Sequence, residues 1–399
     1  MHTATVPMAT AFDHATRSRR RSESLLVELD LDGARGWGEG APRGYVTGET
    51  LEGAAASVRA CDPAALAGRI DWASFDGAVA SIAALSPAVL GPSALPPSAL
   101  ACGPSAAAAL EIALLDAVSR HFGRPLVDVL DVPDVRDVPK RPAGVPRAGA
   151  AAVSLVVHLS RDVTAALEEL TPEARAALRH VKIKVADPDA AVERLRRARE
   201  LLGPDTGISL DVNGGWSPGD AERIADDLAG VAWIEEPLAA RSWAELARLR
   251  RRTGLPVMLD ESCTGPADLR AAVETGAASH VNVRLSKCGG VFAAARLASL
   301  AHELGVGCQL GVHVAEVGPL WAAGRALATG WGPWRTVEAG RGDEWFPEPL
   351  TRPAFAVDRT AHRVLSLSGP GTGVEPTEEL LRHTRCLATW RPDTGWRTT

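Results

Sequence analysis

Five charged side chains recur at nearly constant intervals in the second half of the chain. Lys184, Asp211, Glu235, Asp260 and Lys287 each lie near the end of a short apolar segment, with 24 to 27 residues from one to the next. One strand, one helix and their connections take about this length in a (β/α) barrel. Because the carboxyl ends of barrel strands form one rim, the spacing predicts that these five side chains converge there.

Asp211, Glu235 and Asp260 would together present only oxygen atoms to a ligand. Three buried carboxylates repel one another unless a cation lies between them. Magnesium suits such an oxygen-rich site, with manganese as its usual substitute. In the adjacent acids 235–236 and 260–261 the neighbours should point to opposite faces of a strand, so only one of each pair can face the metal directly.

The lysines have the right placement for proton transfer. Lys182 and Lys184 point to the same face of one strand, as do Asp211 and Asn213. A lysine accepts a proton only if its pKa is lowered, which a second lysine and a nearby dication both do. Lys287 would face the opposite side of the substrate across the mouth of the barrel.

Lysines beside a metal suit the removal of a weakly acidic α-proton from a carboxylate substrate. Loss of that proton puts a second negative charge on the carboxylate oxygens and gives an enediolate. A dication stabilises this charge while a lysine accepts the proton. The predicted chemistry is therefore metal-dependent enolization of a small-molecule carboxylate.

Eight short, β-branched apolar segments alternate with helical patterns after residue 150, which predicts an α/β fold with a closed parallel barrel. The strand candidates are 153–159, 180–186, 207–213, 231–237, 256–262, 280–286, 306–312 and 334–340.

The preceding residues predict a separate unit. Residues 22–40 read as a hairpin with its turn at Asp32–Gly33, and residues 49–131 are mostly helical with a break at 86–98. The Pro- and Gly-rich stretch 132–150 is the best candidate for a domain boundary. We expect a capping domain from residues 1–132 and the tail 350–399, with the barrel in residues 150–349.

The motifs, taken together and in order, resemble those of the muconate lactonizing enzyme subgroup of the enolase superfamily. They are V-K-I-K (181–184), L-D-V-N (210–213), W-I-E-E-P (233–237), L-D-E-S (259–262) and S-K-C-G-G (286–290). Residues 36–50 and 368–380 also resemble that family's capping and closing segments. The resemblance implies a (β/α)₇β TIM-like barrel with an α+β N-terminal capping domain.

By position, the resemblance implies that Asp211, Glu235 and Asp260 bind Mg²⁺. It implies that Lys184 and Lys287 are the acid/base groups on opposite faces of the substrate.

It further implies that Lys182 lowers the pKa of Lys184, and that Asn213 and Glu261 lie behind the metal ligands. A mobile loop at about residues 8–22 would close over the substrate. Phe12 and Tyr45 are candidates for contact with the substrate, or for aromatic packing.

Four further residues near the strand ends have open roles. The His–Asp dyad of the mandelate racemase subgroup would need an Asp where this chain has Arg284, so His313 cannot form it. His313 is then a substrate contact or a structural residue. Glu316 and Glu338 follow the seventh strand and lie in the eighth, where contact with substrate, a hydrogen bond to Lys287 or a structural role are all open.

The motifs leave the outcome of enolization open between cycloisomerization of the muconate type and racemization or epimerization. A lyase of the o-succinylbenzoate synthase type is the alternative, and a barrel that only binds a carboxylate is a remote one. Residues 336–345 lack the Asp-x-Asp with which the family's dipeptide epimerases hold the substrate's amino terminus, which counts against a dipeptide.

Composition adds limits on the partners. The net charge of −6 gives no reason to expect nucleic acid, and no apolar run is long enough for a membrane span. The N-terminus lacks the pattern of a secretory signal, and the six cysteines have no CxxC spacing. We expect a cytoplasmic protein, and the resemblance implies a homo-oligomer, either a dimer or an octamer.

Overall fold

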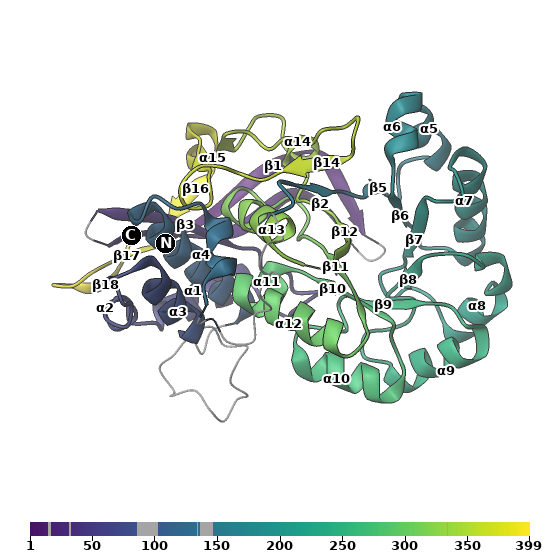
Figure 1. The fold of residues 1–399 in the computed structure, drawn as a ribbon, viewed down its shortest axis with the longest axis horizontal. Helices are drawn as coiled ribbons and strands as arrows, with labels where there is room; N and C mark the ends of the chain where they lie inside the picture. The colour runs from purple at the N-terminus through teal and green to yellow at the C-terminus, as the bar shows by residue number, and fades with distance from the viewer. Residues whose placement is uncertain (15–16, 32, 86–102, 134, 136–146, 333) are drawn as a thin grey trace.

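Eight parallel strands form the sheet that carries the predicted site, in the computed structural model that describes residues 1–399 except 15–16, 32, 86–102, 134, 136–146 and 333 (Figure 1). They pair in chain order, and the backbone N–H of Ser154 donates to the carbonyl oxygen of Val337 at 2.9 Å, which joins the first strand region to the last. The predicted barrel is confirmed. Its strands are β5 (Leu155–Val157), β6 (His180–Lys184), β7 (Gly207–Asp211), β8 (Trp233–Glu235), β9 (Val257–Leu259), β10 (His280–Val283), β11 (Gly307–Leu310) and β12 (Trp334–Val337).

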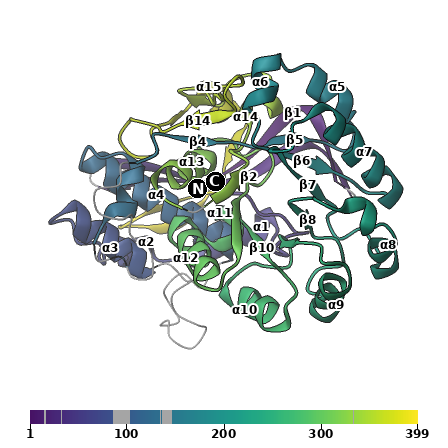
Figure 2. The same cartoon turned by 45° about the vertical axis from the view of Figure 1, so that its right-hand side comes forward.

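Helices follow the strands and cover their outer face, as Figure 2 shows for α7 to α10. In α7 the Asp187 side chain caps the helix by accepting from the Ala190 N–H, Pro188 starts it, and its buried side chains recur at helical spacing. The helices are α5 (Val163–Glu168), α6 (Pro172–Ala177), α7 (Pro188–Leu201), α8 (Pro218–Arg223), η3 (Asp226–Leu228), α9 (Trp243–Thr253), α10 (Pro266–Thr275), α11 (Leu285–Cys288), α12 (Val291–Glu303), α13 (Pro319–Gly330) and α14 (Gly342–Trp345).

An antiparallel sheet in the order β16-β1-β2-β3 lies beside the barrel, with helices packed on it. Its members are β1 (His2–His14), β2 (Arg17–Leu31), β3 (Ala34–Gly40) and β16 (Thr384–Cys386). The helices of this region are α1 (Leu51–Arg59), α2 (Pro63–Ala67), α3 (Phe75–Leu85), α4 (Pro104–His121) and η2 (Leu126–Asp131).

Three alternate glycines of β3 explain why α4 can lie directly on this strand. A Cβ atom at Gly36, Gly38 or Gly40 would come within 2.2, 1.9 and 2.0 Å of carbonyl oxygens of α4. Side chains alternate across a strand, so the G-x-G-x-G pattern leaves one whole face bare for close approach. The pattern therefore fixes the capping helix against the sheet.

The predicted hairpin over residues 22–40 is confirmed by the antiparallel pairing of β2 with β3, although Asp32 lies outside the described residues. The expectation of a loop at residues 8–22 is wrong where the structure describes it. There β1 and β2 pair with each other, with a register shift between Pro7 and Phe12. The predicted break at 86–98 lies outside the described residues, as does most of the 132–150 boundary.

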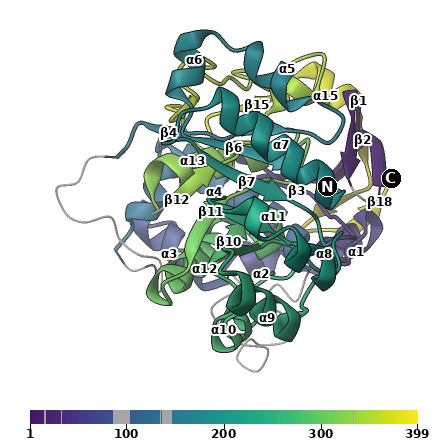
Figure 3. The same cartoon turned by 90° about the vertical axis from the view of Figure 1, so that its right-hand side faces the viewer.

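The tail returns to the N-terminal region, where β16 pairs with β1 and the Met1 ammonium donates to the Ala388 carbonyl at 3.1 Å. Figure 3 shows both chain ends on the same side of the molecule. The remaining elements are β4 (Ala150–Ala152), β13 (Thr351–Arg352), β14 (Arg363–Leu365), β15 (Glu375–Pro376), α15 (Glu378–Arg382), β17 (Ala388–Arg391) and β18 (Gly395–Thr398).

The division into a capping domain of residues 1–132 with 350–399 and a barrel of residues 150–349 stays a prediction, as do the oligomeric state and the compartment. In the described part of the chain, no helix combines the length and the apolar character needed to cross a membrane.

A stack of rings fills the barrel at the amino ends of alternate strands. His180 lies flat on Trp233 with ring centroids 4.7 Å apart, and Trp233 meets His280 at 5.0 Å. His180 is 5% exposed, and burial lowers its pKa to about 3. The unfolded chain, with an ordinary histidine pKa near 6.5, therefore binds a proton that the folded chain excludes.

This difference predicts how stability depends on pH. Stability contributed by neutral His180 is present above pH about 6.5 and is lost as pH falls toward 3, by about 1.4 kcal/mol per pH unit. His180→Gln should remove this dependence, so urea unfolding at pH 7, 6 and 5 should show a shallower loss for the variant. The exposed His302→Gln is the control, and equal slopes for wild type and His180→Gln would refute the assignment.

Candidate active site

The five residues of the predicted rim come from five adjacent parts of the barrel. In the sheet register Lys184 lies opposite Asp211, and Asp211 lies opposite Glu235. Asp260 follows β9 directly, and Lys287 lies in α11 just after β10. The order across the sheet is therefore lysine, three carboxylates, lysine.

Lys182 lies at the centre of the carboxylates and is 2% exposed. Its Nζ is 3.1 Å from Asp211 Oδ2, 2.8 Å from Glu235 Oε2 and 2.8 Å from Glu338 Oε1. Burial acts to lower the pKa of Lys182, but the three carboxylates outweigh burial and hold it well above its usual value. Lys182 is thus a fixed positive charge on the same strand as Lys184.

Lys184 contacts both the carboxylate row and the open cavity. Its Nζ donates to Asp211 Oδ2 at 2.7 Å and to Asn213 Oδ1 at 3.2 Å, and lies 5.6 Å from the centre of the Phe12 ring. Asn213 in turn donates to Glu261 Oε1 at 3.4 Å. These contacts hold the ammonium at the edge of the carboxylate row.

Glu235 is fully buried among charged groups. Asn282 Nδ2 donates to its Oε1 at 2.9 Å, and Gln309 Nε2 to its Oε2 at 3.5 Å. Burial raises the pKa of Glu235 to about 8; Lys182 acts to lower it, whereas Asp211 and Asp260 act to raise it. Burial and the neighbouring carboxylates thus disfavour the ionised form of Glu235, and added positive charge would stabilise that form.

Lys287 and Arg284 both reach Asp260. Lys287 Nζ is 3.0 Å from Asp260 Oδ1, and it also donates to the Asp260 carbonyl at 2.7 Å and to the Asn282 carbonyl at 2.6 Å. The Arg284 guanidinium donates to Asp260 Oδ2 and lies 3.9 Å from Glu235 Oε1. Burial acts to lower the pKa of Lys287, but Asp260 and other nearby groups outweigh burial and raise it, so this side chain is held as an ammonium.

The expectation that Asp260 and Glu261 point to opposite faces stays a prediction, because β9 ends at Leu259, before both residues. Glu261 lines the same cavity as Lys184. The expectation holds for Glu236, which turns away and accepts from the backbone N–H groups of Asp260 and Ser262 at 2.6 and 2.7 Å.

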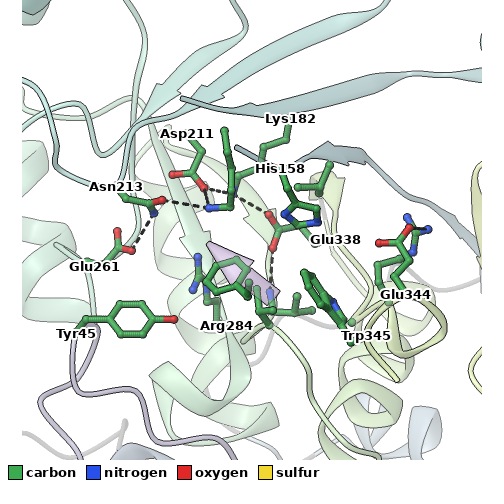
Figure 4. A pocket seen from close by; sticks show the side chains of 17 residues that line it. Tyr45, His158, Lys182, Asp211, Asn213, Glu261, Arg284, Glu338, Glu344 and Trp345 are labelled. Carbon is green, nitrogen blue, oxygen red and sulfur yellow. Dashed lines mark hydrogen bonds and ion pairs between the residues drawn. The ribbon is translucent and has the colours of Figure 1, made fainter. Parts of the chain in front are cut away.

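A cavity with about 580 Å³ of empty space opens above the carboxylates (Figure 4). Figure 4 shows Asp211, Asn213 and Glu261 on one side, with Glu338 and Trp345 on the other. Lys182, Lys184 and Glu338 contribute to its wall, and so do Phe12 from β1 and Tyr45 from the segment after β3. The predicted candidates Phe12 and Tyr45 therefore lie at the cavity.

His313 and Glu316 do not line this cavity, although both were candidates for substrate contact. Both are buried, and the His313 N–H donates to Glu316 Oε1 at 2.8 Å. Burial and nearby cations, Arg284 among them, hold the pKa of His313 well below its usual value. The open possibility that Glu316 or Glu338 bonds Lys287 is also not realised, since Lys287 donates to Asp260 and Asn282.

The site residues fit a hard cation. Asp211, Glu235 and Asp260 are fully buried, all their donor atoms are oxygens, and Asp211 Oδ1 has no hydrogen-bond partner. In the described ranges no group of three or more His, Cys, Asp or Glu side chains is arranged to hold a metal ion. Lysine and arginine groups contact these carboxylates instead. A dication would take over the charge compensation that these side chains provide.

Backbone strain gathers around the same rim. Asn213, Glu236, Ala315, Ala339 and Arg341 all adopt positive φ, between 41° and 65°, just after barrel strands. Such conformations are uncommon outside glycine and persist where the surrounding structure enforces them, often at functional sites. The strain marks the carboxyl end of the barrel as the functional face.

Several residues at the site were missed by sequence reasoning. His158, Arg341, Glu344 and Trp345 line the cavity from the ends of the first and eighth strands. Asn282 and Gln309, which hold Glu235, could have been found as polar residues in apolar strands. Lys182 shows the same signal, a polar side chain within an apolar strand.

A sequence model of the family described as "Enolase C-terminal domain-like" matches residues 163–380, more than half of the chain. The chain belongs to the enolase superfamily. Among relatives in this superfamily, an L-Lys-D/L-Arg epimerase of Methylococcus capsulatus is 30% identical over 337 residues, 81% of this chain and 85% of the other. An L-Ala-D/L-Glu epimerase of Bacillus subtilis is 28% identical over 320 residues, 77% of each chain.

Solved structures of the superfamily share the whole fold. The N-succinyl Arg/Lys racemase from Bacillus cereus covers 96% of this chain and 98% of its own, with a TM-score of 0.75 at 24% identity. A muconate lactonizing enzyme from Pseudomonas fluorescens aligns with a TM-score of 0.74 at 21% identity. Both the superfamily and the enolase-like architecture predicted from the motifs are thus confirmed.

Proposed function

We propose that this chain is a Mg²⁺-dependent isomerase that racemizes or epimerizes the α-carbon of an amino-acid derivative through an enediolate. The observation that carries the proposal is the order lysine, carboxylate, carboxylate, carboxylate, lysine across β6 to β10. Two proton-transfer groups thereby lie on opposite flanks of one metal-binding row. Such an arrangement suits removal of a proton from one face and its return to the other.

Each lysine has a distinct part. Lys184, which lines the cavity, would take the proton from one enantiomer. Lys287 would return a proton to the other face, and the roles reverse for the opposite enantiomer. Magnesium held by Asp211, Glu235 and Asp260, with Mn²⁺ as a substitute, would stabilise the charge that develops on the substrate carboxylate.

Racemization is preferred over cycloisomerization because relatives that match most of the chain are named epimerases and racemases. Their names cover both dipeptides and N-succinyl amino acids, so they leave the substituent on the α-nitrogen open. The lyase outcome of the o-succinylbenzoate synthase type has no support among these relatives.

The proposal is tested by incubation of the enzyme with Mg²⁺ in D₂O and single-enantiomer N-acyl amino acids, dipeptides and muconates. We expect deuterium at the α-carbon and formation of the opposite enantiomer with at least one amino-acid derivative. Absence of exchange with every carboxylate would leave only a binding protein. Full exchange after removal of divalent ions would also refute the proposal.

A further inference from the structure

The cavity has an outer end whose polar groups take no part in the proposed proton transfer. His158 follows β5 and Arg341 follows β12, the two strands that the Ser154–Val337 hydrogen bond joins at the seam of the barrel. Both side chains line the cavity. Figure 4 shows His158 above Trp345, on the side away from Asn213 and Glu261.

The backbone that carries Arg341 is held in an uncommon conformation. Ala339, Gly340 and Arg341 have φ values of 65°, 76° and 52°, so three consecutive residues are left-handed and two of them carry a Cβ. Such a run is unfavourable and persists only where the surrounding structure imposes it. Its effect is to turn the Arg341 side chain inward, where it is 9% exposed.

The guanidinium is only partly satisfied in this position. One Arg341 Nη donates to Glu344, while Nε has no hydrogen-bond partner, with Asp343 Oδ1 3.6 Å away. The Nδ1 atom of His158 is likewise buried without a partner. Unpaired buried donors are costly and point to an acceptor that arrives with a ligand.

The ring of His158 is held in place by its neighbours rather than by hydrogen bonds. It meets Trp345 edge-on with centroids 5.0 Å apart and Phe12 at 6.3 Å. Burial lowers the pKa of His158 to about 4, and the charges of Lys184 and Arg341 lower it as well. At neutral pH it is therefore an uncharged ring able to donate one N–H.

We propose that Arg341 and His158 form a subsite for a second anionic group of the substrate, a carboxylate at the far end of an arm attached to the α-nitrogen. This inference rests on the proposed racemase function, since the α-carboxylate is assigned to the metal end of the cavity. A guanidinium and a neutral imidazole N–H suit carboxylate oxygens. Glu344 already accepts a hydrogen bond from Arg341 and so orients it. Arg341 carries only donors and therefore offers no acceptor to a substrate arm that ends in a cation.

The test compares two substrates that differ only in charge at the end of the arm: the N-succinyl and N-succinamoyl derivatives of one amino acid. For the wild type we expect kcat/KM for α-exchange to favour the succinyl compound by about 10-fold to 100-fold, typical of a charge-assisted hydrogen bond. Arg341→Gln should bring the ratio close to one, and His158→Gln should reduce it less.

Arg359→Gln is the matched control. Arg359 contacts Asp343 and Glu344 in the same charge cluster but does not line the cavity, so its loss should leave the ratio unchanged. Binding of both compounds is also measured calorimetrically in Lys184→Ala, where the preference for the succinyl compound should persist without turnover.

The outcomes separate this inference from the proposed function. Equal kcat/KM for both compounds in the wild type, or a ratio unaffected by Arg341→Gln, would overturn the subsite while exchange itself upholds the racemase. Preference for a β-alanyl arm, which ends in an ammonium, would overturn it too and point to Glu344 as the recognition group. Absence of exchange together with a preserved binding preference would overturn the racemase and leave the subsite standing.

Discussion

Replacement of Lys184 with alanine is expected to abolish α-deuterium exchange on one enantiomer of the substrate while the other still exchanges. Lys184 Nζ reaches the cavity from one flank of the carboxylate row, whereas Lys287 lies on the other flank. Loss of a general base costs about 10²-fold to 10⁴-fold in rate. Lys287→Ala should show the converse loss, and both are measured by NMR in D₂O with each enantiomer separately.

Lys184→Arg separates proton transfer from charge. Arginine keeps a positive group near Asp211 but is not deprotonated in proteins, so exchange on the same enantiomer should stay lost while the fold is retained. If Lys184→Arg exchanges as the wild type does, Lys184 is only a charge. If both alanine variants lose both enantiomers equally, the two-sided assignment fails.

The lysines of the site stand out because the rest of the chain nearly avoids this residue type. Only four lysines occur among the 399 residues, and Lys182, Lys184 and Lys287 are three of them. The chain uses arginine elsewhere, where a permanent charge serves. Lysine, unlike arginine, can lose a proton, which is what the proposed roles of Lys184 and Lys287 require.

The nearly constant interval between the charged residues predicted the barrel as well as the site, because one interval is the length of one strand, one helix and their connections. Local pattern was less informative where strands end. β9 stops at Leu259, so strand alternation does not decide which way Glu261 points, and the structure places it at the cavity. Similarly, the family resemblance implied a mobile loop at about residues 8–22, but the described part pairs as strands.

The outer end of the cavity could not be predicted because it depends on closure of the barrel. His158 and Arg341 are 183 residues apart in sequence and meet only because β5 and β12 adjoin at the seam. No interval or motif links them. The sequence left the role of His313 open for a similar reason: it directly follows a cavity-lining residue, Val312, yet does not line the cavity itself.

Substitution of Glu235 by glutamine is expected to remove the response of the protein to Mg²⁺ without harm to the metal-free fold. Glutamine has the shape of the protonated acid but is a poorer ligand for a hard cation. We expect the affinity for Mg²⁺ and the rate of α-exchange each to fall by at least about 100-fold, beyond the loss typical of residues that only support a metal ligand. Exchange is measured over a range of Mg²⁺ concentrations.

The sign of the effect on stability follows from the pKa of Glu235, which burial and neighbouring carboxylates raise to about 8. A carboxyl group whose pKa is raised on folding destabilises the protein as pH rises from about 4.5, its unfolded value, toward 8. In EDTA at pH 7 to 8, Glu235→Gln should therefore melt no lower than the wild type, since Lys182 keeps Asp211 and Glu338 as partners.

Added Mg²⁺ should then reverse the order of the two proteins. Binding to the folded state alone raises the melting temperature of the wild type, whereas the variant should hardly respond. Exposed Glu274→Gln is the matched control and should respond as the wild type does. A variant that Mg²⁺ stabilises fully would show that Glu235 is an ion-pair partner of Lys182 rather than a ligand. In that case Glu235→Gln should also be much less stable than the wild type in EDTA, because the buried Lys182 ammonium would have lost a counter-charge that it needs.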